Sequence, residues 1–189
     1  MKIIFVGGVQ GVGKSTLLSW AKRRFGRKVV VLDPGAFFRK YFYSKKIKTI
    51  EEIEDLIVAK IKKSPTSRVT LVHWHYAVKR SSGYIPQVSV SRLNQIAQCK
   101  YIQKIILLMI QAPAPMIYAR RMKDINKKKR GLTYAEIEKE IAMDEIFMKR
   151  QVQLFARSMR RGRLERSYIS NSNLKVSMRD FAGLIKGLL

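Results

Sequence analysis

The sequence predicts an α/β protein in which helices cover both faces of a parallel sheet of about five strands. Two observations carry this expectation. A glycine-rich loop, "GGVQGVGKST" at residues 7–16, joins a short apolar run to a stretch with helical periodicity, and apolar runs then alternate with helical patterns. The chain has 189 residues without repeats or low-complexity linkers, so we expect one domain over residues 1–189.

The predicted strands are short runs rich in β-branched, aliphatic and aromatic residues. They cover residues 2–6, 28–33, 68–74, 104–110 and 166–170. The second run stops at Asp33-Pro34-Gly35, where proline and glycine favour a turn. Residues 105–110 are all apolar, which is typical of a strand buried on both faces of its sheet.

The predicted helices rest on apolar spacing and on capping signals. Thr49 and Thr133 each precede a glutamate by three residues, as in a capping box. Helical patterns cover residues 14–25, 37–46, 49–63, 90–98, 134–159 and 178–189. On the long helix over residues 134–159 the expected apolar stripe comprises Ile137, Ile141, Ile146, Met148, Val152 and Phe155.

Residues 8–15 match the pattern G-x-x-x-x-G-K-[ST] at every fixed position, between a predicted strand and a predicted helix. Glycines let the backbone bring several N–H groups onto phosphate oxygens, and the following helix adds the positive end of its dipole. A tight strand-to-helix turn would explain the glycines but not the Lys-Ser pair. The pattern therefore predicts a P-loop NTPase three-layer fold with ATP and Mg²⁺ as ligands.

Seven residues of this loop are the expected nucleotide-binding residues. They are Gly8, Gly11, Val12, Gly13, Lys14, Ser15 and Thr16. Lys14 has the length to reach the β- and γ-phosphates, and the Ser15 hydroxyl is the expected Mg²⁺ ligand.

The charge of the chain is strongly positive: 39 Lys and Arg residues oppose 13 Asp and Glu residues, a formal net charge of +26. Such a balance favours a polyanionic partner, RNA or the ribosome before a membrane, although a solvated surface of a lysine-rich protein is the plain alternative. With Cys99 as its single cysteine the chain can form no intrachain disulfide, and no apolar run is long enough to cross a bilayer. We expect a cytoplasmic protein. The sequence does not predict its oligomeric state.

A second block of residues, "LVHWHYAVKRSSGYIPQ" at 71–87, resembles a segment of the archaeal adenylate kinases. That family of P-loop nucleoside monophosphate kinases carries Asp-Thr-His after its third strand and then a Ser-Gly-Tyr-Leu-Pro turn. Here His75 matches the histidine, and residues 82–86 match the turn with Ile85 in place of leucine. The opening of the chain and "YARRMKD", with Arg120 and Asp124, also look like that family.

The resemblance implies transfer of the γ-phosphoryl group of ATP to AMP. It also implies an acceptor-binding region near residues 33–65 and a short basic lid near residues 120–132. Lys14, Arg120 and Arg130 are the catalytic candidates, because arginine offers planar donor forks suited to a phosphoryl group. The acceptor-site candidates are Asp33, His75, Arg80 and Tyr84.

Several positions depart from the family's pattern. His73 stands where an acidic residue normally helps to hold Mg²⁺ through water, and Ala36 replaces the acid of a Gly-Asp pair, with Asp33 close by. Lys79 stands where an arginine is usual, and Arg80 is offset by one residue. His73 and His75 share one face of a predicted strand, where we favour a site-lining or core role over a transition-metal site.

Three functions are compatible with these observations. The first is an active adenylate-kinase-like phosphotransferase. The second is an ATP-binding protein with weakened or lost transfer chemistry that acts mainly through RNA or the ribosome, as a related branch of adenylate-kinase-like proteins does in small-subunit biogenesis. The third is a membrane-surface protein. We identify no amphipathic helix with an exposed apolar face in the sequence that would support it.

Overall fold

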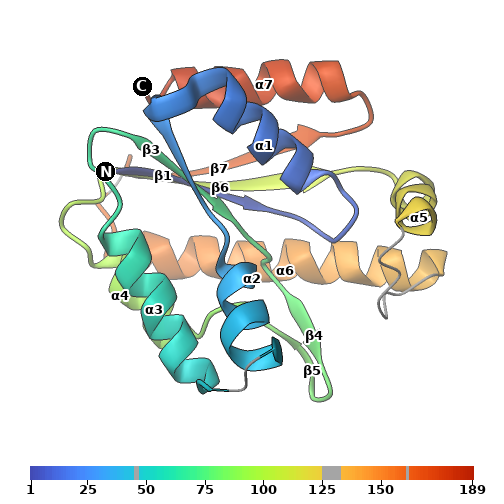
Figure 1. Ribbon diagram of the computed structural model, residues 1–189, viewed down its shortest axis with the longest axis horizontal. Helices are drawn as coiled ribbons and strands as arrows, with labels where there is room; N and C mark the ends of the chain where they lie inside the picture. The colour runs from blue at the N-terminus through green and yellow to red at the C-terminus, as the bar shows by residue number, and fades with distance from the viewer. Residues whose placement is uncertain (45–46, 125–132, 161) are drawn as a thin grey trace.

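A computed structural model describes residues 1–44, 47–124, 133–160 and 162–189. Within these residues the main sheet has five strands, all parallel, in the order β2-β3-β1-β6-β7 (Figure 1). The strands are β1 (Lys2–Gly7), β2 (Val29–Leu32), β3 (Val69–His73), β6 (Lys104–Gln111) and β7 (Leu164–Ser170). The predicted parallel sheet of about five strands is confirmed, with bounds that differ by at most a few residues.

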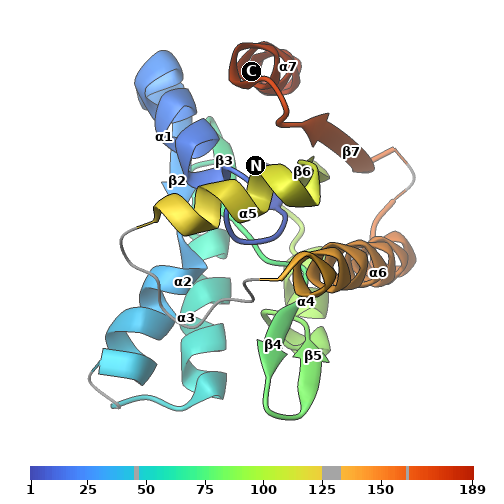
Figure 2. The same cartoon turned by 90° about the vertical axis from the view of Figure 1, so that its right-hand side faces the viewer.

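Helices cover both faces of this sheet and complete the predicted three layers (Figures 1 and 2). On one face lie α1 (Lys14–Phe25) and α7 (Leu174–Lys186). On the other lie α2 (Pro34–Phe37), α3 (Ile50–Lys62), α4 (Val90–Ala97) and α6 (Tyr134–Ser158). A short helix, α5 (Ala114–Lys123), follows β6 at the end of the sheet where the strands terminate.

The central strand shows how the sequence builds two cores. Successive side chains of β1 point to opposite faces, so Ile3 and Phe5 join the cluster beneath α3, α4 and α6, whereas Ile4 and Val6 join the cluster beneath α1 and α7. All four are fully buried. This double burial is why β1 reads as a continuous apolar run instead of an alternating one.

The capping signals locate two helix starts correctly. The Thr49 side chain accepts a hydrogen bond from the Glu52 N–H, and the Thr49 N–H donates to the Glu52 carboxylate, so the capping box at the start of α3 is confirmed. At α6 the Thr133 hydroxyl likewise accepts from the Glu136 N–H. The last helix begins at Leu174, four residues before the predicted start, because Asn173 caps it by accepting from the Val176 N–H.

Two segments differ from their predicted form. The helix expected over residues 37–46 is α2 continued by a π-helix, Phe38–Ser44. The turn block of the resemblance forms an antiparallel hairpin of β4 (Val78–Arg80) and β5 (Gly83–Ile85), which lies outside the main sheet. Its two strands have three residues each, which is too short for the sequence pattern to predict them. Gly83, which follows the turn, has a positive φ of 110°.

The stripe predicted for α6 is wrong at Ile146, which is 40% exposed. The buried positions of this helix include Ile137, Asp144, Met148 and Phe155. Position 146 lies two residues, and so roughly 200° around the helix, from both 144 and 148. A stripe drawn from apolar residues alone misses the two polar side chains, Asp144 and Gln151, that lie on the buried face.

The predicted lid, residues 120–132, falls mostly outside the described residues. Arg120 to Lys123 form the last turn of α5 and Asp124 follows, whereas 125–132, including Arg130, are not described.

In the described parts of the chain, no helix is long and apolar enough to pass through a bilayer.

The two isoleucines of α6 give a direct test of the packing. Ile137 is fully buried, so Ile137→Ala should lower the free energy of unfolding by about 2–5 kcal/mol. Ile146→Ala makes the same chemical change at an exposed position of the same helix and should cost less than about 1 kcal/mol. Urea unfolding of both variants provides the measurement. Similar losses in the two variants would contradict the burial pattern.

Candidate nucleotide and acceptor site

The glycine-rich loop connects the carboxyl end of β1 to the start of α1. Gly8 and Gly13 adopt positive φ angles of 133° and 103°, which other residues rarely reach. Space is equally restrictive, because a Cβ on Gly13 would lie 2.2 Å from the Asn171 side-chain nitrogen, and one on Gly8 would lie 2.5 Å from the Ile110 carbonyl oxygen. The loop is therefore pressed against β6 and the end of β7 and can hold its shape only with glycine at these positions.

Lys14 is the first residue of α1, and its side chain is buried against the loop. Its ammonium group donates to the carbonyl oxygens of Gly8 and Val9, the latter at 3.0 Å. Burial lowers the pKa of Lys14 to about 8, and the cation of Arg121 adds to this, whereas Asp144 and Glu140 oppose it. Among the described residues the hydrogen bonds of this buried ammonium go to neutral carbonyls, which makes it a candidate to bind a phosphate.

A cavity of about 470 Å³ lies over the loop, and we call it the loop cavity. Of the predicted nucleotide-binding residues it brings together Gly11, Gly13, Lys14, Ser15 and Thr16. It also contains Arg120 and His73. Gly8 and Val12 do not line it: Val12 is buried, and its carbonyl is held from the protein side.

Two side chains hold that Val12 carbonyl. Arg120 donates to it at 3.1 Å and to the Asn171 carbonyl at 2.9 Å, and the Asn171 side chain donates to it at 2.7 Å. Asn171 directly follows β7 and is buried. Sequence reasoning missed it, although a polar residue at the carboxyl end of a parallel strand was an available signal.

Arg121, the neighbour of Arg120, was also missed. It is 2% exposed and donates to the Gln10 carbonyl from Nε at 3.0 Å and from Nη2 at 2.9 Å. Its guanidinium also forms an ion pair with Glu140 at 2.5 Å. This contact ties α5 and α6 to the loop, and so links the start of the predicted lid to the phosphate-binding region.

A second cavity, of about 310 Å³, adjoins the loop and is called the hairpin cavity here. Of the predicted acceptor-site residues, His75 and Tyr84 line this cavity. Arg80 was also predicted, but its neighbour Lys79 lines the cavity instead. Burial and the nearby cation of Lys14 hold the pKa of His75 well below its usual range, so this imidazole is neutral. Its wall also contains Glu140 and Asp144 of α6, which sequence reasoning did not single out.

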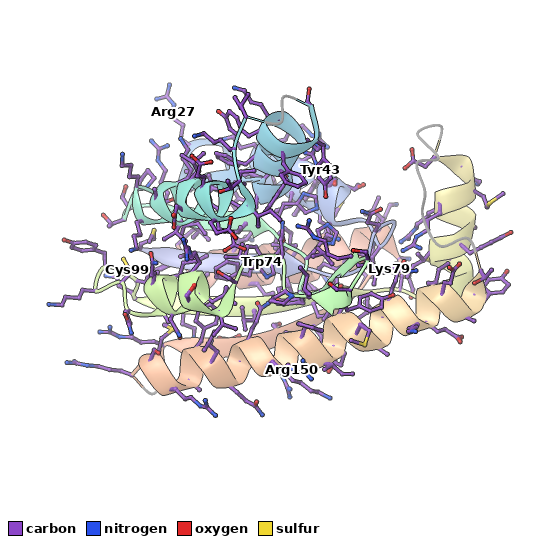
Figure 3. The ribbon with its side chains drawn as sticks, turned by 90° about the horizontal axis from the view of Figure 1, so that it is seen from below. Arg27, Tyr43, Trp74, Lys79, Cys99 and Arg150 are labelled. Atoms are coloured by element: carbon purple, nitrogen blue, oxygen red, sulfur yellow. The ribbon has the colours of Figure 1, made fainter. Side chains whose placement is uncertain are left out.

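The loop cavity and the hairpin cavity meet at the glycine-rich loop. Val9 and Gln10 line both of them. Figure 3 shows Lys79, of the hairpin cavity, on the same side of the molecule as Tyr43, which lines that cavity from the π-helix. Trp74 lies deep in the body of the protein, packed edge-on against Phe5 at 4.9 Å between ring centroids, and so is not free to stack on a base.

Asp33, an acceptor-site candidate, lies beside His73 and Arg39. Its carboxylate lies 3.5 Å from the His73 ring nitrogen and 2.6 Å from the Arg39 guanidinium. Burial raises the pKa of Asp33, but the hydrogen bonds to His73 and Arg39 outweigh this and hold it well below its usual range, so the carboxylate is ionised. It lines a cavity of about 370 Å³ together with Ser15, while His75 and Tyr84 lie in the separate hairpin cavity.

The donors around Ser15 fit Mg²⁺. A hydroxyl and a carboxylate on one cavity are the hard oxygen ligands that this ion prefers, and it commonly uses only one or two protein ligands beside water and phosphate. Over residues 1–44, 47–124, 133–160 and 162–189, no group of three or more His, Cys, Asp or Glu side chains could hold a metal ion by itself. The rings of His73 and His75 lie 5.8 Å apart.

Comparison with known proteins places the fold. No protein-family model matches the chain, and no curated protein matches it in sequence. Among solved structures it is similar to a shikimate kinase from Acinetobacter baumannii in complex with shikimate, with a TM-score of 0.51 and 17% identity, over 100% of this chain and 92% of that one. At this identity the likeness shows the fold alone: the chain shares the α/β fold of that kinase, a five-stranded parallel sheet covered by helices on both faces.

Asn171 and Asn173 provide a matched test of the loop support. Asn171→Ala removes the 2.7 Å hydrogen bond to the Val12 carbonyl and should raise the dissociation constant for ATP about fivefold to tenfold, as expected for roughly 1 kcal/mol. Asn173→Ala removes a helix cap and should lower stability by about 1 kcal/mol without changing that constant. Calorimetric titration with ATP measures both. Unchanged ATP affinity in Asn171→Ala would show that the loop does not need this support.

Proposed function

We propose that the protein binds ATP with Mg²⁺ and transfers the γ-phosphoryl group to an acceptor bound in the hairpin cavity. One observation carries the proposal: two separate cavities meet at a glycine-rich loop, with Lys14 in the wall of one and in electrostatic contact with Asp144 of the other. A donor and an acceptor bound in them would have their reacting groups near the same residues, Val9 and Gln10. Phosphoryl transfer requires such positioning, together with neutralisation of charge, and no covalent intermediate.

The chain's own residues account for the donor side. Lys14 would leave the loop carbonyls for the β- and γ-phosphate oxygens, and the loop N–H groups at the start of α1 would bind the remaining oxygens. Ser15 would hold Mg²⁺, and the ionised Asp33 lines the same cavity as Ser15. Mg²⁺, when bound, supplies charge neutralisation on the phosphate oxygens. Arg120 would act in this cavity by fixing the loop, and we retain it with Arg130 as a candidate for contact with the transferred group.

The acceptor is the less determined half of the proposal. The resemblance to archaeal adenylate kinases implies AMP, and the wall of the hairpin cavity contains His75, Tyr84 and the cation of Lys79. The catalytically weakened alternative draws its strength from the missing acid at His73. The position of Asp33 beside His73 weakens that alternative, because a carboxylate is present on the cavity that Ser15 lines.

The assay combines ATP, Mg²⁺ and AMP and measures ADP by coupled enzymes. We expect turnover that Lys14→Ala lowers by at least about 10²-fold, because the buried ammonium contacts the transferred group in the transition state. Arg23→Ala, which removes an exposed cation of the same helix, should retain turnover. Activity in Lys14→Ala equal to that of the unmodified protein would contradict the role of the loop. Absence of turnover with AMP, while ATP binds, would exclude AMP as the acceptor.

A second function, association with RNA or the ribosome, is favoured by where the exposed cations lie. Arg24, Arg27 and Lys28 are exposed just before β2 begins, and Arg157 and Arg160 are exposed just before β7 begins. Because the main sheet is parallel, both groups lie at the edge where strands start, opposite the glycine-rich loop (Figure 1). Arg27 points away from the body of the protein in Figure 3. RNA bound at this edge would leave the nucleotide site open.

Salt dependence tests this second function. For a fluorescent single-stranded RNA, the logarithm of the association constant should fall linearly with the logarithm of the salt concentration. The expected slope is about −0.7 for each phosphate neutralised. Arg27→Glu should lower affinity several-fold, whereas Lys175→Glu, the same change of charge at an exposed position of α7, should have a smaller effect. An affinity indifferent to salt would contradict contact with the RNA backbone.

A further inference from the structure

Asp144 is a buried carboxylate in the wall of the hairpin cavity. It lies on α6 and is 2% exposed. Its Oδ1 accepts a hydrogen bond from the Ala77 N–H at 2.8 Å, which fixes the side chain against the segment that follows β3. Its Oδ2 is buried and has no hydrogen-bond partner among the described residues. A buried carboxylate oxygen without a partner is costly to the fold, so a ligand that supplies the missing donor is the natural reason for it.

Several ionisable groups surround Asp144, in addition to Tyr43 of the π-helix, which lines the same cavity. They are Lys14 of α1, His75 and Tyr76 after β3, Lys79 of β4, Tyr84 of β5 and Glu140 of α6. Burial raises the pKa of Asp144 to about 6, although the Ala77 N–H and Lys14 act in the opposite direction. Above that pH the group is an ionised carboxylate, and below it the group is neutral and can no longer accept a proton.

This wall suits one kind of acceptor better than another. The hairpin cavity presents the buried carboxylate of Asp144 beside a neutral His75, while Glu140 in the same wall is paired with Arg121 and Lys79 supplies an ammonium. A phosphate monoester beside Asp144 would meet like charge, and its oxygens carry no proton that must be removed before attack. An alcohol would supply the missing donor to Oδ2 and would need a base to become a nucleophile.

We propose that the acceptor presents a hydroxyl group to Asp144, which takes its proton as the hydroxyl oxygen attacks the γ-phosphorus of ATP. The inference rests on the proposed phosphoryl transfer, and it assigns an alcohol as the class of acceptor where the resemblance implies AMP. The acceptor oxygen forms a bond to the γ-phosphorus, the bond from that phosphorus to the bridging oxygen of ADP breaks, and ADP leaves with the electron pair. The hydroxyl proton passes to Oδ2 of Asp144 and then to solvent.

Adenosine and AMP are the matched probes, because they share base and ribose and differ in a 5′-hydroxyl against a 5′-phosphate. With radiolabelled ATP, labelled AMP reports transfer to adenosine and labelled ADP reports transfer to added AMP. The variants are Asp144→Asn, whose amide cannot take the proton, and Glu145→Gln, the same change at the next residue, which does not line the hairpin cavity. The dissociation constant for ATP is measured in each protein.

The expected result is faster transfer to adenosine than to AMP in the unmodified protein. The adenosine rate should fall as pH drops through about 6, because Asp144 is then protonated. Asp144→Asn should lower that rate about 10²-fold or more and abolish this acid limb. The AMP rate should not fall, because no proton has to be removed from a phosphate acceptor, and the Glu145→Gln rates should stay unchanged.

Four results would overturn the proposal. One is transfer to AMP with none to adenosine, which leaves the proposed function standing. Another is an equal loss of both rates in Asp144→Asn with an unaltered pH profile, which indicates a structural role. The third concerns the case in which neither probe is phosphorylated but ATP is hydrolysed, so that water is the acceptor. Hydrolysis with the same pH profile in Asp144→Asn as in the unmodified protein would then overturn the proposal. Bound ATP without transfer or hydrolysis removes the proposed function and this inference together.

Discussion

The site depends on hydrogen bonds that other parts of the chain donate to the carbonyl oxygens of the glycine-rich loop. Lys14 holds the Gly8 and Val9 carbonyls, Arg121 holds that of Gln10, and Arg120 and Asn171 share that of Val12. Glycines make this curled backbone accessible, but their freedom alone would not select one conformation. Apart from Lys14 of α1, the donors come from α5 and from the residue after β7, so the loop geometry requires the carboxyl end of the sheet to be assembled.

The same contacts place unusual charges near one another at that edge. Lys14 is a buried cation with a lowered pKa, and Asp144 is a buried carboxylate with a raised one. Arg121 and Glu140 form an ion pair at the same edge, so their charges neutralise each other. Strongly perturbed ionisable groups concentrate where chemistry is done, because stability alone gives little reason to keep them buried. Their position at the junction of two cavities is the arrangement on which the proposed reaction rests.

Local pattern was enough to predict the fold and the loop, but not the walls of the site. The strands, the capping boxes and the loop are short-range features, because their structure depends on residues that are close together in the sequence. Asn171 and Arg121 become part of the site only through contacts across more than a hundred residues of sequence. Asp144 was missed for a different reason: a stripe drawn from apolar residues passes over a buried carboxylate. The Asp33–His73 contact likewise required the spacing of two neighbouring strands.

A crystal structure with a non-hydrolysable ATP analogue and Mg²⁺ is the most direct measurement of the central claim. We expect the triphosphate to follow the loop, with the Lys14 ammonium moved from the Gly8 and Val9 carbonyls onto the β- and γ-phosphate oxygens. The γ-phosphate should then lie beside Val9 and Gln10, where the loop cavity meets the hairpin cavity. A nucleotide bound elsewhere, or Lys14 still held by the loop carbonyls with the triphosphate in place, would contradict the account.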